Sequence, residues 1–398
     1  MKKRIYLDYN ATTPISEEVK SKIIESLSLY GNASSMHESG RTARRQIEEA
    51  RRHAAALIGA KESEIIFTSG GSESNNTVFE TMRAVIFDGE KRPERAEIIT
   101  TEIEHPCVLN AARRLKNMGV KVVFLPVDEE GKIKMEEYRN ALNEKTLLVS
   151  IMTANNEIGV IQDMKEISSL AKEAGALLHT DAVQAAGKIP INVDELKIDY
   201  LTMSCHKIYG PKGVGALYKR KGAPLSPLVH GGHQEDGYRA GTYNNSGIIA
   251  FGAAAQDALK KLPEYGKTMG ALREKLMNGL LERVPTIKIN GPKTGVLPNT
   301  LNVSFPGAEG EAILLSLDIQ GIEASTGSAC ASGSLDPSHV LMAIGVWPEL
   351  AHGSIRFSLG WGITEEDIDY VLETVPPIIK RLRSMSTIAC CTISEKIK

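Results

Sequence analysis

The sequence predicts an α/β fold, with a large domain built on a mostly parallel seven-stranded sheet and a smaller α+β domain. Between about residues 60 and 220, short β-rich runs alternate with helical or turn-rich stretches, which is typical of a parallel sheet covered on both faces. The length of 398 residues suits two domains, or one large fold with an appendage. Several β-rich runs end in polar clusters, and open α/β sheets bind ligands beyond the carboxyl ends of their strands. We therefore expect one site assembled from distant parts of the sequence.

The first predicted element of the large domain is an amphipathic helix at residues 41–57. Its arginines are expected to form a solvated face rather than a nucleic-acid patch, with Glu48 and Arg52 paired one helical turn apart. Seven strands follow and make up the predicted sheet, at residues 64–68, 97–101, 121–126, 146–152, 176–180, 200–203 and 214–218.

The smaller domain is predicted from the rest of the chain. Two helical patterns occupy residues 248–283 and are expected to break near Pro263, because proline cannot donate the helical hydrogen bond. A helix near residues 309–319, a Gly/Ser-rich loop and the strand SIRFSLG come next, and the N-terminal residues are expected to complete this unit. We place the large domain at residues 16–262 and the small domain at residues 1–15 together with 263–398.

Composition excludes several classes of function. Lys plus Arg is 47 and Asp plus Glu is 49, a net charge of −2, so there is no bulk positive field for direct binding of nucleic acid. No apolar run approaches the ~18 residues of a membrane helix, and the first residues leave no room for the ~7 to 15 apolar residues of a signal peptide. We expect a cytoplasmic protein that binds neither membranes nor nucleic acid.

The five cysteines show no CxxC spacing, which argues against a disulfide framework or a zinc knuckle. Cys330 lies in STGSACASGS, where every residue is small, so the segment has little to bury and its thiol is expected to be mobile and reactive. An inert cysteine would instead be packed among apolar neighbours. The others are Cys107, Cys205, Cys390 and Cys391.

Lys207 lies just after a buried strand and before a Gly/Pro turn. Its flanking residues Ser204 and His206, with partial desolvation, suit a lysine that forms a Schiff base. By itself Lys207 would more often be a surface loop lysine, and Lys212 inside the turn is a competitor.

Asp181 ends an apolar strand, and Gln184 follows three residues later. Burial of a carboxylate costs free energy unless a cation lies beside it, and a protonated pyridine nitrogen is such a cation. A helix N-cap is the alternative role for Asp181. Together with a Schiff-base lysine, this carboxylate makes pyridoxal phosphate the economical interpretation.

A phosphate site is expected in TSGGSESNN, where Gly70 and Gly71 allow close backbone approach and Ser72 begins a helix with unpaired N–H groups. An ordinary capped turn would look the same. His105 could lie on the cofactor ring or serve a structural role. Arg356 lies in an apolar strand and needs an anion, either a substrate carboxylate held by two hydrogen bonds or an internal carboxylate.

In combination these motifs resemble the NifS/IscS-type (group I) cysteine desulfurases, which are fold-type I pyridoxal-phosphate enzymes of the class V aminotransferase superfamily. The resemblance runs nearly the length of the chain, through YLDYNATTP, GNASSMH, FTSGGSESNN, TANNEIGV, HTDAVQ, SCHKIYGPKGVG, YRAGTYN, STGSAC and SIRFSLG. Two positions depart from the family pattern. Gly70-Gly71-Ser72 replaces the usual Gly-Ala-Thr, and His233 replaces a glycine; a metal site at His230 and His233 is not favoured.

The resemblance implies a role for each candidate residue. Lys207 would form the Schiff base, Cys330 would accept sulfur, and Asn156 with Arg356 would bind the cysteine carboxylate. A homodimer with a shared site is implied through Thr242, which would reach the phosphate of the other subunit. The remaining cofactor contacts would be Gly71, Ser72, Ser204 and His206 at the phosphate, His105 on the ring, Asp181 at the pyridine nitrogen and Gln184 at the phenolic oxygen.

The implied reaction converts L-cysteine to L-alanine and leaves the sulfur on the enzyme as a persulfide. A sulfur-acceptor protein, such as an iron–sulfur scaffold or a tRNA-thiolation protein, would then remove it. Three alternatives remain open: a selenocysteine lyase, a β-lyase that releases sulfide directly, and a non-catalytic scaffold for sulfur-transfer proteins. The resemblance assigns no role to Cys390 or Cys391.

Overall fold

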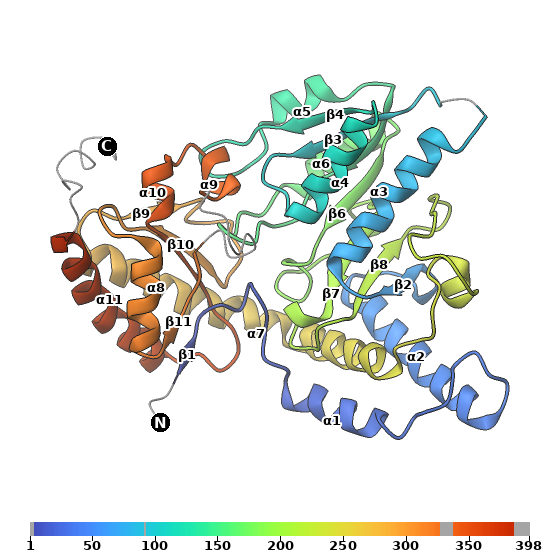
Figure 1. Ribbon diagram of the computed structural model, residues 1–398, viewed down its shortest axis with the longest axis horizontal. Coiled ribbons are helices and arrows are strands. Elements are labelled where there is room, and N and C mark those ends of the chain that lie inside the picture. Colours follow the sequence, from blue (N-terminus) through green and yellow to red (C-terminus); the bar gives the residue numbers. More distant parts are fainter. Residues whose placement is uncertain (1–3, 91–92, 327–336, 386–398) are drawn as a thin grey trace.

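A seven-stranded sheet forms the larger part of the protein (Figure 1). The structure is a computed structural model that describes residues 4–90, 93–326 and 337–385. Within this sheet, ordered β2-β8-β7-β6-β5-β3-β4, β8 is antiparallel to both neighbours and the other pairs are parallel. The predicted sheet is confirmed. Its strands are β2 (Ile65–Thr68), β3 (Glu97–Thr101), β4 (Lys121–Leu125), β5 (Thr146–Ser150), β6 (Leu177–Asp181), β7 (Tyr200–Ser204) and β8 (Gly215–Lys219).

Alternate residues of these strands enter two different hydrophobic clusters, because successive side chains of a strand point to opposite faces. Tyr200 packs with one cluster, whereas Leu201 and Met203 pack with the other. The first cluster contains side chains of α3 (Gly71–Phe87) and α4 (Pro106–Asn117). The second contains side chains of α2 (Glu38–Leu57), α5 (Met135–Ala141), α6 (Met164–Glu173) and the N-terminal half of α7 (Asn245–Arg283).

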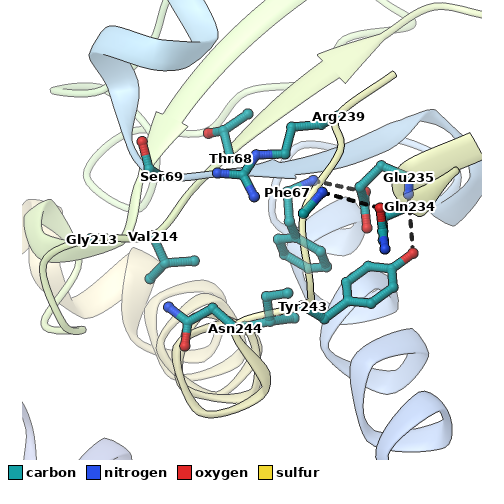
Figure 2. A pocket seen from close by; sticks show the side chains of 12 residues that line it. Phe67, Thr68, Ser69, Gly213, Val214, Gln234, Glu235, Arg239, Tyr243 and Asn244 are labelled. Carbon is teal, nitrogen blue, oxygen red and sulfur yellow. Dashed lines mark hydrogen bonds between the residues drawn. The ribbon is translucent and has the colours of Figure 1, made fainter. Parts of the chain in front are cut away.

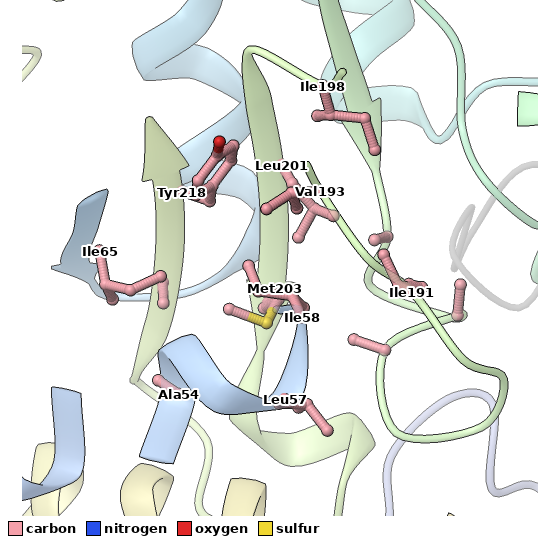
Figure 3. Close-up of a cluster of buried hydrophobic side chains, with 14 of the residues drawn as sticks. Ala54, Leu57, Ile58, Ile65, Ile191, Val193, Ile198, Leu201, Met203 and Tyr218 are labelled. Carbon is pink, nitrogen blue, oxygen red and sulfur yellow. The ribbon is translucent and has the colours of Figure 1, made fainter. Parts of the chain in front are cut away.

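Figure 3 shows the end of α2 packed on this second face, with Ala54, Leu57 and Ile58 beside Met203 of β7. All four side chains are almost fully buried. Burial of a Leu or Ile side chain contributes roughly 1.5 to 3 kcal/mol, so contacts of this kind hold the helices to the sheet. The helix α1 (Glu17–Ser26) precedes α2 and contacts α7.

One arginine of α2 departs from the predicted solvated face. Arg51 is buried and donates two hydrogen bonds to the carboxylate of Glu235, at 2.6 and 2.8 Å. Glu48 pairs with Arg44 and Arg51, whereas Arg52 lies 3.9 Å from Glu62. The predicted Glu48–Arg52 pair is therefore wrong. Long-range packing brings Glu235 to α2, and a buried guanidinium requires such a partner.

A second, three-stranded antiparallel sheet lies beside the first and has the order β12-β10-β9 (Figure 1). The N-terminal β1 (Ile5–Tyr6) pairs in parallel with β11 (Ile322–Glu323), and one hydrophobic cluster contains side chains from both ends of the chain. The other elements of this part are β9 (Lys288–Asn290), β10 (Thr300–Ser304), α8 (Gly310–Ile319), α9 (His339–Ala343), α10 (Pro348–His352), β12 (Ser354–Ser358) and α11 (Glu365–Met385).

The helix α7 runs from Asn245 to Arg283 without a break, although Pro263 lies inside it. The predicted pair of helices is therefore wrong. One end of α7 packs on α1 and α2 and the other on α11, and this packing offsets the missing proline hydrogen bond. Because α7 crosses residues 262 and 263, the boundary placed there stays a prediction. In the described part of the chain, no helix combines the length and apolar character needed to cross a membrane.

Candidate functional site

A cavity of about 250 Å³ opens at the carboxyl ends of β6 and β7, beside the N-terminus of α3. This is the edge of the sheet at which the sequence predicted a site. Among its lining residues are the predicted Gly71, Ser72, His105, Asn156, Asp181, Gln184, Ser204, His206 and Lys207, and with them Asn10, Ala11, Asn75, Cys107, Met152, Ala154 and Val183.

Lys207 lies in the short 3-10 helix η2 (Cys205–Lys207) that follows β7. Its Nζ donates to the backbone carbonyl oxygens of Asn10 and Ala11, which belong to the N-terminal loop. Lys212 is exposed and lies outside the lining of the cavity. The geometry therefore favours Lys207 over Lys212 as the lysine that meets a ligand in this cavity.

Asp181 ends β6 with its carboxylate buried in the cavity wall. Oδ2 accepts a hydrogen bond from Nδ2 of Asn75 at 2.6 Å, and Oδ1 accepts one from the backbone of Val183 at 2.9 Å. No helix begins in the turn after β6, so the N-cap alternative for Asp181 is not observed in this described segment. Sequence reasoning missed Asn75, although it lies in the TSGGSESNN motif.

The predicted phosphate site surrounds the first turn of α3. Ser204 and His206 line the cavity together with Gly71 and Ser72, so hydroxyls and the N-terminus of α3 face the same cavity. Packing requires small residues here. A Cβ on Gly71 would lie 2.8 Å from Cγ2 of Val183.

His105 combines the two roles that the sequence left open. It is the N-cap of α4, where its Nδ1 accepts from the backbone N–H of Cys107, and its ring also lines the cavity. Burial lowers the pKa of His105, so the ring is neutral near pH 7. Burial likewise lowers the pKa of His206 to about 4 and raises that of Cys107 to about 12.

Arg356 lies on β12 and is 1% exposed, outside the lining of the cavity. Its Nη2 donates to the Asp8 carboxylate at 2.7 Å, and its Nη1 donates to the backbone oxygen of Asn156 at 3.2 Å. The internal carboxylate partner considered from the sequence is thus present. Nε of Arg356 is buried without a hydrogen-bond partner among the described residues, which leaves one donor for another anion.

Thr242 is exposed and lies outside the lining of the large cavity of its own chain. Its neighbours Gly241 and Tyr243 line a smaller cavity of about 50 Å³ (Figure 2). Figure 2 shows Glu235 there, accepting from the backbone N–H of Phe67 and donating its own backbone N–H to the Tyr243 hydroxyl. The turn that carries Thr242 is therefore fixed to β2 and, through Arg51, to α2.

Three predicted cysteine positions, Cys330, Cys390 and Cys391, lie outside the described residues. The expected mobility of the Cys330 segment therefore stays a prediction. His230 and His233 are exposed, and the described residues contain no group of three side chains that could hold a metal ion.

The family described as aminotransferase class-V matches residues 5–371. The chain belongs to this family. "Cysteine desulfurase IscS" of Dictyoglomus turgidum is 49% identical over 387 residues, covering 97% of each chain, and the protein of the same name from Methanosarcina thermophila is 48% identical, covering 96% of this chain and 94% of its own.

Solved structures of NifS-like proteins are also similar to this chain. A NifS-like protein superposes with a TM-score of 0.88 at 41% identity, over 95% of this chain and 100% of the other. A NifS-like protein from Rickettsia africae gives a TM-score of 0.84 at 34% identity, over 95% of this chain and 99% of its own.

Family members of this type depend on pyridoxal 5′-phosphate, and the cavity of this chain fits that cofactor. A lysine, a buried carboxylate, a neutral histidine and a helix N-terminus face one cavity. These groups suit, in that order, the aldehyde, the pyridine nitrogen, the aromatic ring and the phosphate of the cofactor. When bound, the cofactor supplies an electron sink for negative charge that develops on an amino-acid substrate.

Proposed function

We propose that this chain is a cysteine desulfurase that removes sulfur from L-cysteine and passes it on through its own cysteine, Cys330. The observation that carries the proposal is the meeting of Lys207, Asp181 and His105 at one cavity, in a chain whose relatives bear the name cysteine desulfurase. A non-catalytic scaffold would have no need of this arrangement.

Each residue has a distinct part in the proposed reaction. Lys207 would hold the cofactor through its amine and would move the Cα proton of the substrate, for which an amine in a partly buried position is suited. Asp181 keeps the ring nitrogen protonated, and Asn75 holds the Asp181 carboxylate in place. Asn156 and Arg356 would bind the substrate carboxylate, for which a guanidinium group is suited.

The remaining cofactor contacts follow from their positions in the cavity. Gly71, Ser72, Ser204 and His206 line the cavity and would bind the phosphate, His105 would lie on the ring, and Gln184 would donate to the phenolic oxygen. Their grouping around one space of about 250 Å³ supports these roles.

Sulfur transfer needs a thiol, and in this proposal it is Cys330. The Cβ–S bond of cysteine breaks, the sulfur bonds to Sγ of Cys330, and the products are L-alanine and a Cys330 persulfide, so that atoms and electrons balance. Cys107 is a poor substitute, because burial raises its pKa to about 12 and only thiolates attack sulfur efficiently.

The test is mass spectrometry of the holoprotein after a single turnover with L-cysteine. We expect one added sulfur on Cys330 and one L-alanine per site. The Cys330→Ser variant should bind the cofactor normally and form no persulfide, with Cys205→Ser as the matched control that keeps the persulfide. Free sulfide with no persulfide on Cys330 would instead indicate a direct β-lyase or a selenocysteine lyase. If the visible absorption of the cofactor-loaded protein never changes when cysteine is added, the protein is a non-catalytic scaffold.

The proposed assembly is a homodimer in which Thr242 completes the phosphate site of the partner subunit. Thr242 is exposed and lies away from the cavity of its own chain, which suits a contact made across an interface. Large apolar side chains near α1 also face solvent, namely Ile24, Leu27, Tyr30 and Met36, exposed by 69, 69, 87 and 89%.

Mixing Thr242→Ala with Lys207→Ala subunits should restore activity in hybrids, whereas a fully active monomer in sedimentation would contradict the sharing.

The cellular role that we propose is sulfur supply in the cytoplasm to an acceptor protein, either an iron–sulfur scaffold or a tRNA-thiolation protein. The net charge of −2 supports a protein acceptor over direct contact with nucleic acid. Capture of persulfide-accepting proteins on the cysteine-treated enzyme, followed by transfer of labelled sulfur, distinguishes the two acceptors.

A further inference from the structure

A second lysine lies behind the cavity wall, and no role in the proposed reaction accounts for it. Lys188 follows Gln184 by four residues and is only 4% exposed. Its Nζ donates to Oε1 of Gln184 at 2.7 Å and to Oδ1 of Asn10 at 2.9 Å. Among the described residues no carboxylate pairs with it, so its partners are two amide oxygens. A buried amine without a carboxylate is costly, and such a residue is usually retained for a specific purpose.

The contact with Lys188 decides which way the Gln184 amide points. Because Nζ of Lys188 donates to Oε1 of Gln184, this oxygen faces Lys188 and Nε2 faces the other way. Nε2 donates to the backbone oxygen of Asn10 at 2.9 Å, and Nζ of Lys207 donates to the same oxygen. The donor end of Gln184 is therefore on the side of Lys207 and the cavity.

Lys188 also fixes Asn10, whose side chain joins the two sheets. Oδ1 of Asn10 accepts from Lys188 and from Asn299, and Nδ2 donates to Thr300 Oγ1 and to the backbone oxygen of Asn156. Asn299 and Thr300 lie at the start of β10 in the smaller sheet. Every polar atom of the Asn10 side chain is thus engaged, which gives the amide a single orientation.

We propose that Lys188 is a positioning residue that fixes the Gln184 amide with its N–H₂ group toward the phenolic oxygen of the cofactor. The proposal deepens the proposed function and rests on it for the presence of the cofactor. A hydrogen-bond donor that faces that oxygen favours the deprotonated form of the bound cofactor. Without Lys188, the amide can turn its own oxygen toward the phenolic oxygen, and this preference is lost.

Other charged groups near Lys188 come from several elements and must be held constant in a test. Burial lowers the pKa of Lys188 well below its ordinary value, and the positive charges of Lys207 and Arg356 lower it further. A small cavity of about 10 Å³, large enough for about one water molecule, brings three titratable groups of α7 to the same place. The titratable and charged groups to consider are Lys207, His206, Tyr209, Arg356, Asp8, Asp181, Asp257, Lys261 and Tyr265.

The experiment follows the visible absorption of the cofactor-loaded enzyme as a function of pH, without substrate. Lys188→Met should raise the pH at which the bound cofactor changes colour by about one unit, the size expected for loss of one hydrogen bond. Lys188→Gln keeps a donor but not the charge, and should shift it less. The matched control is Lys261→Met. Lys261 lines the same small cavity but pairs with Asp257 and not with Gln184, so its removal should leave the titration unchanged.

A double variant separates positioning from a general effect. In a Gln184→Leu background, Lys188→Met should add no further shift, because the amide that it orients is absent. Additive shifts, an unchanged titration in Lys188→Met, or an equal shift in Lys261→Met would each overturn the proposal. If Lys188→Met fails to fold, the Lys188→Gln titration decides alone. These spectra involve no sulfur transfer, so an enzyme that binds the cofactor but leaves cysteine intact would overturn the proposed function and not this one.

Discussion

Asp8 and Asn10 are two residues of one loop, and each holds a different group of the site. Asp8 accepts from Arg356, and Asn10 accepts from Lys188 and Lys207. The chain thereby fixes its buried cations with oxygens from the N-terminal loop. This loop follows β1, which pairs with β11 at the far end of the sequence.

The contact between Asp8 and Arg356 leads to a prediction that separates two roles of the arginine. Arg356→Ala should weaken cysteine binding by roughly ten- to hundred-fold, the value of a charge-assisted hydrogen bond of ~1.5 to 3 kcal/mol. The absorption of the bound cofactor should not change. Asp8→Asn removes the internal partner and keeps the guanidinium, so it should bind cysteine at least as tightly as the wild type.

Cysteine titrations of the cofactor spectrum measure both effects. Equal loss of cysteine affinity in Arg356→Ala and Asp8→Asn would mean that the arginine acts on Asp8 and not on the substrate.

At the scale of elements, α7 is the clearest case of packing that overrides a local signal. Its N-terminal half packs on the large sheet together with α2, and its C-terminal half packs in the cluster that holds β10 and α11. A helix that ended at Pro263 would expose the hydrophobic side chains of one of these two clusters to solvent.

We predict that Pro263→Ala stabilises the protein. Alanine supplies the N–H that proline lacks and removes a ring that crowds the preceding turn, a defect of ~3 kcal/mol in a helix interior. Greater freedom of the unfolded chain cancels ~0.4 to 1 kcal/mol of this, so the free energy of unfolding should rise by about 2 kcal/mol. Urea unfolding followed by circular dichroism provides the measurement.

Gly266→Ala in the same helix is the comparison, because a Cβ there meets nothing within 4 Å. It should gain about 1 kcal/mol from helix propensity alone. A Pro263→Ala variant less stable than the wild type would show that the helix is built around the proline.

At the scale of the whole molecule, buried carboxyl groups tie stability to pH. Burial raises the pKa of Glu104 to about 8 and that of Glu157 to about 7, so both are neutral in the folded protein at mildly acid pH. Glu157 accepts from the Ser338 hydroxyl, and Oε1 of Glu104 accepts from the backbone N–H of Met152. Both carboxyls lie close to the cavity, next to His105 and Asn156 in sequence.

The sign of the pH dependence follows from these raised values. An unfolded glutamate ionises near pH 4.5, whereas folded Glu104 keeps its proton until about pH 8. Its contribution to stability is therefore complete below about pH 4.5 and is lost as pH rises to about 8. Glu104→Gln should become more stable relative to the wild type over that interval and stay level above it.

Thermal unfolding between pH 4.5 and pH 8.5 measures this trend, with the exposed Glu102→Gln as the matched carboxyl-to-amide control. A constant difference between Glu104→Gln and the wild type across the interval would contradict the raised pKa.

The sequence by itself determined the large sheet and most of the residues around the cavity. Short apolar runs specify the strands locally. The polar motifs come directly after these runs, so they can be recognised in the sequence as well. Lys207 and Gly71 follow strands of this sheet and Asp181 ends another, so the directions of the strands bring all three to one edge.

Only the tertiary structure decided the partners of the buried charges. Arg51 meets Glu235 across 184 residues, Arg356 meets Asp8 across 348, and Lys188 meets Asn10 across 178. No local periodicity encodes such pairs, because a charged side chain looks the same in sequence whether it faces water or a distant partner. Burial then makes each pair obligatory, since an unpaired charge in the interior costs more free energy than the contact itself returns.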